Sequence, residues 1–160
     1  MSSVSRSRQI SRSRPSAVNV NSIVSAVLTV QTQGKGFVDL TADVAKFVRE
    51  AGAHEGAVTL FIRHTSASLT IQENADPSVL ADLETALARL APEDFAWTHD
   101  TEGRDDMPAH VKTMLTGVSL QIPVLNGELA LGTWQAIYLV EHRSRPHARD
   151  VVLQFLGAVT

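Results

Sequence analysis

Three histidines occupy positions that packing in a hydrophobic core does not explain. His64 lies at a break in strand periodicity, His99 lies in a long acidic segment, and His110 lies in the first turn of a predicted helix. The chain has no cysteine, so imidazole is its remaining borderline-soft ligand, and three imidazoles with an open coordination position form a metal site. The alternative is that each ring is a surface or hydrogen-bonded residue, since no HExxH-type spacing links them.

Carboxylates lie close to two of these histidines along the chain. Side chains on a helix lean toward its N-terminus, so the ring of His110 should point back toward the segment that holds His99, Asp105 and Asp106. A carboxylate that accepts the second ring N–H orients a metal-binding histidine. We therefore expect Asp106 to lie behind His110.

A second candidate is Glu73, in the stretch HTSASLTIQENADP. Glu73 and Asn74 end a predicted strand just before a helix N-terminus, a place that favours an anion or a polarised ligand. Glu73 is then a general base or a metal ligand. The alternative is that Glu73, Asn74 and Asp76 are turn and cap residues.

A contrast of charge separates two loops. The segment 93–106 is acidic, whereas the segment 143–149 carries Arg145 and Arg149 among its basic residues. An acidic lobe for a divalent cation and a basic lobe for phosphate oxygens would suit a magnesium diphosphate substrate. The alternative for the basic segment is a solvated hairpin turn.

The tetrapeptide GTWQ places Trp134 and Gln135 within a strand predicted for residues 128–142. Trp134 could stack on a planar heterocycle whose edge Gln135 would hydrogen-bond. Neighbouring residues of a strand face opposite sides, so both reach one ligand only if the strand is bulged or subunits share the site. The default is that Trp134 is a core or subunit-interface residue.

The elements that must position these residues predict an α+β fold. Apolar, β-branched or alternating stretches predict strands at 23–30, 57–63, 67–73, 118–124, 128–142 and 151–156. Helical spacing predicts helices after Thr41, Asp76 and Pro108, and the last of these should face inward with Val111, Met114 and Leu115. We expect one domain over residues 21–160, with a mostly antiparallel, sandwich-like sheet packed with two or three helices.

Composition restricts the partners. The chain has 160 residues and a net charge of −3, and the four arginines before residue 20 make the remaining body more acidic. Such a body does not favour nucleic acid, and no apolar run reaches the roughly 20 residues that span a membrane. Residues 1–20 read as a disordered, basic Ser/Arg tail, and an organelle transit peptide is the alternative to a cytoplasmic location.

Three motif-rich segments, HTSASLTIQENADPSVLADLE, DDMPAHVKTML and SLQIPVLNGELALGTWQAIYLVEHR, together resemble the YjbQ family, described as secondary thiamine-phosphate synthases. The resemblance covers about residues 20–159. It implies an α+β domain that assembles as a homotrimer, with sites at or near subunit boundaries. It also implies a histidine-lined metal pocket, which corresponds here to His64, His99 and His110.

The resemblance further implies a transferase that joins hydroxymethylpyrimidine diphosphate to a thiazole phosphate and releases diphosphate. In that mechanism an ion on the three histidines takes the diphosphate oxygens, and Arg145 or Arg149 adds positive charge to the leaving group. Glu73 and Asp106 orient the pyrimidine amine or the histidines, and Trp134 forms a wall. Three imidazoles suit zinc or a similar ion, whereas magnesium would accompany the substrate diphosphate.

Two alternatives to the synthase stay open from sequence. One is a metal-dependent hydrolase of phosphate or amide esters. The other is a trimeric protein that binds a metal or small ligand without catalysis.

Overall fold

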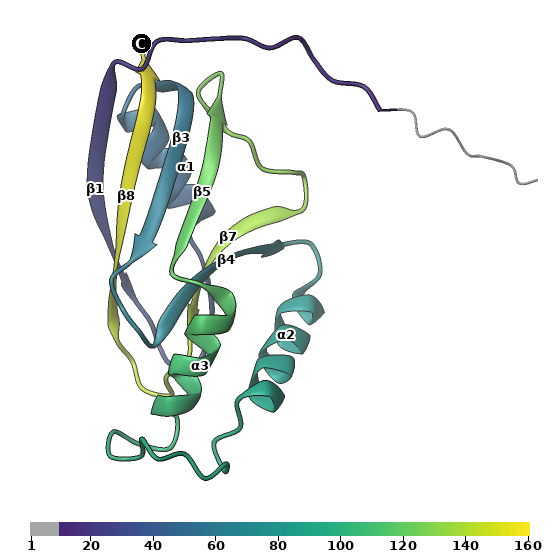
Figure 1. Cartoon of the computed structure of the whole chain (residues 1–160), viewed down its shortest axis with the longest axis vertical. Coiled ribbons are helices and arrows are strands. Elements are labelled where there is room, and N and C mark those ends of the chain that lie inside the picture. The colour runs from purple at the N-terminus through teal and green to yellow at the C-terminus, as the bar shows by residue number, and fades with distance from the viewer. Residues whose placement is uncertain (1–9) are drawn as a thin grey trace, which may run out of the picture.

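Two antiparallel sheets form the body of the protein in the computed structural model, which describes residues 10–160 (Figure 1). The first sheet has five strands in the order β1 (Ser22–Gln31), β8 (Ala148–Val159), β3 (Ala53–Ile62), β5 (Ser119–Leu125) and β6 (Glu128–Leu129). The second has three strands in the order β2 (Gly36–Asp39), β7 (Gln135–Glu141) and β4 (Ala67–Glu73). The predicted antiparallel α+β architecture is therefore confirmed.

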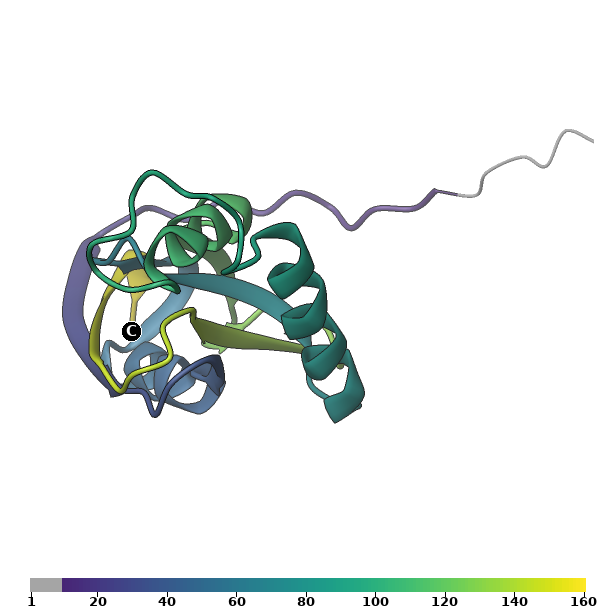
Figure 2. The same ribbon diagram turned by 90° about the horizontal axis from the view of Figure 1, so that it is seen from below.

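Three helices accompany the sheets within the described residues: α1 (Thr41–Glu50), α2 (Pro77–Leu90) and α3 (Asp106–Thr116). Helix α1 buries Val44, Phe47 and Val48 in the core. Helix α2 begins as predicted, because Asp76 Oδ1 accepts a hydrogen bond from the Ser78 amide at 2.9 Å and Pro77 follows the cap. Helices α2 and α3 and the loop between them lie at the opposite end of the molecule from the C-terminus (Figures 1 and 2).

The core lies where the two sheets and α1 meet. Its largest fully buried side chains include Leu60 and Ile62 on β3, Leu69 on β4, Leu139 on β7 and Phe155 on β8. Each such side chain contributes about 1.5–3 kcal/mol when it leaves water. This packing fixes the ends of β3, β4 and β7, from which the candidate site is built.

The periodicity break at His64 is a change of sheet. The chain leaves the first sheet at Ile62 and enters the second at Ala67, so the buried face changes parity across the turn, as predicted. The connection from β7 back to β8 lies at the same end, since Ala67 pairs with Glu141 and the amide of Arg63 donates to the carbonyl of Asp150 at 3.0 Å. Two sheet-crossing connections are thus neighbours.

The prediction of one continuous strand over residues 128–142 is wrong. The stretch is divided into β6 in the first sheet and β7 in the second. Between them a turn is closed by Gln135, whose amide donates to the Gly132 carbonyl at 2.9 Å and whose Oε1 accepts from the Gly132 amide at 2.8 Å. Trp134 therefore lies in a turn before β7 and not within a strand.

The inward face predicted for the third helix is also wrong. Met114 and Leu115 are 78% and 54% exposed, whereas Ala109, Lys112 and Thr113 are buried. Helix α3 packs mainly on β4. The face of the helix that is buried by this contact contains residues three and four positions apart, beginning at Ala109. The resulting rotation places His110 beside the turn between β3 and β4.

Residues 10–21 contain neither helix nor strand, and the chain before Asn21 extends away from the body (Figure 1). The first nine residues of the predicted Ser/Arg tail lie outside the described residues, and disorder of the tail stays a prediction. Among residues 10–160 no helix is both long and apolar enough to cross a membrane. The cytoplasmic location stays a prediction.

Candidate metal centre

Two of the three predicted histidines meet at the start of α3, together with one aspartate. His99 comes from the loop after α2, Asp106 is the first residue of α3, and His110 lies one turn later. Their nearest nitrogen and carboxylate atoms all lie within 4.8 Å of one another. Two zinc–nitrogen bonds of about 2.0–2.1 Å nearly span that distance, so small side-chain movements would bring all three onto one ion. We call this group the His–Asp cluster.

The tautomer of His110 is fixed by the backbone. Its Nδ1 lies 2.9 Å from the carbonyl oxygen of Thr65, and because a carbonyl only accepts, Nδ1 carries the proton. In the neutral ring, Nε2 then presents a lone pair, and it faces Asp106 Oδ2 at 3.5 Å. An imidazole lone pair and a carboxylate oxygen repel each other unless a proton or a metal ion lies between them.

His99 completes the cluster from the loop side. Its Nε2 lies 2.8 Å from the same Asp106 oxygen, Oδ2, and the rings of His99 and His110 have centroids 5.7 Å apart. The side chain of Asp106 is buried, whereas those of His99 and His110 are 44% and 34% exposed. The cluster is thus a buried carboxylate flanked by two imidazoles that solvent can reach.

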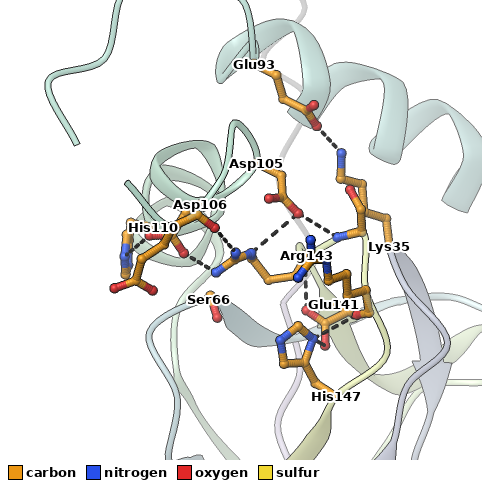
Figure 3. Close-up of polar contacts among 12 residues, drawn as sticks. Lys35, Ser66, Glu93, Asp105, Asp106, His110, Glu141, Arg143 and His147 are labelled. Carbon is orange, nitrogen blue, oxygen red and sulfur yellow. Dashed lines mark hydrogen bonds and ion pairs between the residues drawn. The ribbon is translucent and has the colours of Figure 1, made fainter. Parts of the chain in front are cut away.

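Arg143, in the β7–β8 connection, holds the other side of this carboxylate (Figure 3). Its Nη1 donates to Asp106 Oδ1, and its Nη2 donates to the Glu102 carbonyl at 2.8 Å. Next to it, Asp105 Oδ2 accepts from the Ser144 amide at 2.7 Å. Burial would raise the pKa of Asp105, but this hydrogen bond and the charge of Arg143 outweigh it, so the pKa is lowered.

His64 does not join the cluster, so the expected three-histidine arrangement is not formed within one chain. Its Nε2 accepts a hydrogen bond from the Asp150 amide at 2.9 Å, and its Nδ1 lies 3.4 Å from Nη1 of Arg149. Burial, followed by the charge of Arg149, lowers the pKa of His64. The backbone of β8 therefore supplies a hydrogen-bond partner for the ring of His64. The third member of the cluster, with His99 and His110, is Asp106 and not His64.

Arg149 belongs to a separate, closed group that we call the Glu141 cluster: Thr32, Glu141 and Arg149. Arg149 forms a bidentate pair with Glu141, with Nε–Oε2 and Nη2–Oε1 distances of 2.7 and 2.6 Å. Thr32 Oγ1 also donates to Oε2 at 2.8 Å. Burial acts to raise the pKa of Glu141, but the hydrogen bonds from Arg149, Arg143 and Thr32 lower it.

This pairing changes the expected role of the basic turn. The charge of Arg149 is offset by a buried carboxylate, so its guanidinium is not free for substrate phosphates within this chain. Arg145 is exposed on the turn, and its carbonyl accepts from Nδ1 of His147 at 2.8 Å. The side chain of Arg145 makes no hydrogen bond or ion pair within residues 10–160. Its contact with a substrate phosphate therefore stays a prediction.

Glu73, Trp134 and Gln135 lie together at the other end of the second sheet. Glu73 pairs with Gln135 in the β4–β7 register, and the amide of Asn74 donates to the carbonyl of Trp134 at 3.0 Å. The strand from Ala67 to Glu73 rises about 3.4 Å per residue, which separates these residues from the turn that contacts His110. Trp134 is 63% exposed. Within one chain they are not part of the His–Asp cluster.

Sequence reasoning assigned no role to two buried residues at the end of β7 and directly after it, Glu141 and His142. Glu141 Oε1 accepts from the Arg143 amide at 2.9 Å, which ties the two clusters together. His142 is buried with its Nε2 2.8 Å from Ser68 Oγ, and burial, then the charge of Lys112, lowers its pKa to about 4. The only signal in the sequence was the run EHRSR, which reads as an ordinary basic turn.

Comparisons with known proteins agree with one family over most of the chain. Residues 26–158 match the family model described as UPF0047 protein YjbQ-like. A UPF0047 protein of Synechocystis is 50% identical over 83% of this chain and 91% of its own length. The YjbQ protein of Salmonella typhimurium is 41% identical over 81% of this chain and 95% of its own.

Solved structures agree in the same way. A YjbQ/UPF0047 family protein of Clostridium acetobutylicum matches with a TM-score of 0.74 and 38% identity, covering 82% of this chain and 98% of its own. A hypothetical protein of Aeropyrum pernix matches with a TM-score of 0.78 and 29% identity, covering 84% and 99%. The fold described above is therefore shared along nearly its whole length.

These comparisons overturn the synthase function that the resemblance implied. The matching family model and relatives are described only as UPF0047 or YjbQ proteins, and none is described by a thiamine-phosphate synthase activity. The fold and the motifs therefore carry over, whereas the joining of a pyrimidine diphosphate to a thiazole phosphate does not. The chain belongs to the YjbQ-like UPF0047 family.

Proposed function

We propose that the protein binds one divalent transition-metal ion between His99, Asp106 and His110 and keeps that ion open to a small ligand. The observation that carries the proposal is the orientation of His110. The Thr65 carbonyl fixes its proton on Nδ1, so the Nε2 lone pair faces a carboxylate oxygen 3.5 Å away. A cation between these two atoms turns their repulsion into attraction.

The donor set fits a borderline ion. Two imidazole nitrogens and one carboxylate oxygen suit zinc, or iron in its divalent state, whereas magnesium prefers oxygen ligands alone. In the structure Nε2 of His99 donates to Asp106 Oδ2 at 2.8 Å, because a carboxylate only accepts. Nδ1 makes no hydrogen bond within residues 10–160, so the ring proton can move to Nδ1 when an ion binds. Nε2 of His99 would then offer its lone pair to the ion.

The surroundings leave room for a further ligand. A cavity of about 260 Å³ lies beside His99, lined by the loop that holds Phe95, Trp97 and Arg104. The rings of Phe95 and Trp97 pack in a tilted arrangement, with centroids 4.6 Å apart and planes at 53°, and Trp97 Nε1 donates to the Pro92 carbonyl at 2.9 Å. This volume lies just below the range of about 300–1,000 Å³ that is usual for ligand pockets, so it suits only a ligand smaller than a drug-sized molecule. A bound ion would act as a Lewis acid toward an oxygen atom of such a ligand.

Self-association remains part of the proposal. The outer face of the first sheet exposes Ile23, Val27, Phe61 and Leu156, which are 67%, 55%, 46% and 49% exposed. Cross-strand pairing puts them on one face, opposite the core. Covering this face with copies of the same chain agrees with the expected homotrimer. Sedimentation equilibrium should give the mass of three chains, and a monomer at micromolar concentration would contradict it.

The metal proposal is tested by elemental analysis of protein purified after growth in zinc-supplemented medium. We expect close to one ion per chain in the wild type and in His147→Ala, because His147 lies outside the cluster. His110→Ala should lose the ion. A wild type that carries less than a tenth of an ion per chain would reject the proposal.

A further inference from the structure

Arg143 lies between the two clusters and contacts both. Its guanidinium donates to Asp106 in the His–Asp cluster, and its backbone amide donates to Glu141 (Figure 3). We propose that Arg143 is a positioning residue that keeps Asp106 a monodentate ligand, so that one more coordination position stays open to an external ligand. The inference rests on the proposed metal function, and it identifies the residue that controls the access of a ligand to the ion.

The two oxygens of Asp106 have different partners. Oδ1 accepts from Arg143 Nη1, whereas Oδ2 faces the imidazoles of His99 and His110 at 2.8 and 3.5 Å. A charge-assisted bond from a guanidinium is strong and directional. Turning the carboxylate so that both oxygens reach an ion would break that bond. Only Oδ2 is therefore offered to the metal.

Three contacts besides the one with Asp106 hold Arg143 in place. Its Nη2 donates to the Glu102 carbonyl at 2.8 Å, and its Nε lies 3.4 Å from Asp105 Oδ2. Its amide donates to Glu141 Oε1 at 2.9 Å, while the next amide, of Ser144, donates to Asp105 Oδ2 at 2.7 Å. The side chain of Arg143 is only 15% exposed. A side chain fixed in this way can direct Asp106 without being reordered when an ion binds.

Charge gives Arg143 a second effect on the cluster. Asp105 and Asp106 are adjacent carboxylates, and Arg143 is within ion-pair distance of both. Without its positive charge, the two carboxylates would repel each other, and Asp106 would have a free Oδ1 to turn toward a cation. A bidentate carboxylate would fill the position that an external ligand needs.

The test uses cobalt(II) as the metal probe and azide as the external ligand. Metal-free wild type, Arg143→Met and Arg143→Lys are titrated with cobalt(II), followed by visible absorption, and then with azide. Arg89→Ala is the matched control, because it removes an exposed arginine on α2 that belongs to neither cluster. Circular dichroism and the unfolding temperature show whether each variant is folded.

We expect Arg143→Met to bind cobalt(II) at least as tightly as the wild type, because the change removes a positive charge beside the ion and frees Asp106 Oδ1 to coordinate it. Its cobalt(II) spectrum should change, and azide should bind it more weakly than it binds the wild-type complex. Arg143→Lys should recover part of the azide affinity, and Arg89→Ala should match the wild type. A folded Arg143→Met whose cobalt(II) spectrum and azide affinity match those of the wild type would overturn the inference.

Failure of the metal function gives a different result, since the wild type itself would then bind no cobalt(II). If Arg143→Met does not fold, the wild-type complex with zinc decides the question by crystallography. One Asp106 oxygen on the ion, with the other on Arg143, supports the inference. Both oxygens on the ion would overturn it.

Discussion

Two charged clusters lie side by side at the same end of the molecule, and they differ in how completely their polar atoms are paired. In the Glu141 cluster, both carboxylate oxygens accept bonds from Arg149, and Thr32 and the Arg143 amide add further donors. In the His–Asp cluster, one oxygen of Asp106 lies 2.8 Å from Nε2 of His99 and 3.5 Å from Nε2 of His110, and both rings are partly exposed. Four donors from the chain close the first cluster, whereas the second keeps two imidazole nitrogens and a carboxylate oxygen within reach of one ion.

The difference shows which charges hold the fold and which are free to bind. A buried ion pair whose every oxygen has a donor is costly to break, but it offers nothing to a ligand. A buried carboxylate beside half-exposed imidazoles keeps donor atoms in reach of solvent. Arg149 therefore belongs to the structure, while His99, Asp106 and His110 belong to the proposed metal function.

The largest expected effect comes from breaking the complete cluster. Glu141→Ala leaves Arg149 as a buried, unpaired charge, so the free energy of unfolding should fall by about 3–5 kcal/mol. Urea unfolding of the metal-free protein measures it. The control Glu50→Ala removes a carboxylate that is 67% exposed, 3.8 Å from Lys46, and should cost no more than about 0.5 kcal/mol. Equal losses in both variants would contradict the comparison.

Acid should destabilise the protein through His142. Its pKa is about 4 in the fold against 6.5 for the free side chain, so the unfolded chain takes up its proton first. As the pH falls from 6.5 to 4, about 3 kcal/mol of stability should be lost. Urea unfolding at steps of pH should show this slope, and His142→Asn should remove most of it.

The exposed His54 supplies the control for that measurement. His54→Asn removes a ring whose side chain is 47% exposed and should leave the slope unchanged. A wild-type stability that does not vary between pH 6.5 and 4 would show that His142 is not held neutral by burial.

Replacing His64 tests whether stability and metal binding depend on different residues. His64→Ala removes the acceptor of the Asp150 amide, which should cost about 1–3 kcal/mol of stability. Its affinity for cobalt(II) should match that of the wild type, because His64 lies outside the His–Asp cluster. Loss of metal binding in a folded His64→Ala would restore the three-histidine site that the sequence predicts.

The smallest effect is expected at the far end of the second sheet. Trp134 is 63% exposed, so Trp134→Ala should change the free energy of unfolding by no more than about 0.5 kcal/mol. Metal affinity should also be unchanged when measured by the same cobalt(II) titration. A clear loss of metal binding would show that Trp134, from this or another copy of the chain, reaches the ion.

Local patterns were sufficient to predict the part of the site that depends on one helix. The lean of helical side chains toward the N-terminus correctly placed His110 near His99 and Asp106. The period change at His64 likewise indicated a turn, and the structure shows a change of sheet there. Both signals come from residues close together in the chain.

Long-range contacts decide the parts that sequence reasoning missed. His64 is satisfied by an amide 86 residues away, and Glu141, which pairs with Arg149, accepts a further bond from Thr32, 109 residues away. The rotation of α3, which exposes Met114 and Leu115, depends on its contact with β4. A pattern of residue types contains no information about which distant strand edge will meet a given ring.

The most direct test of the account is a crystal structure of the protein grown with zinc, with anomalous maps collected on both sides of the zinc absorption edge. We predict one zinc peak bonded to His99 Nε2, His110 Nε2 and Asp106 Oδ2, at about 2.0–2.2 Å from each, with His110 Nδ1 still on the Thr65 carbonyl. No peak at these atoms under saturating zinc, or a peak centred on His64 instead, would contradict the account.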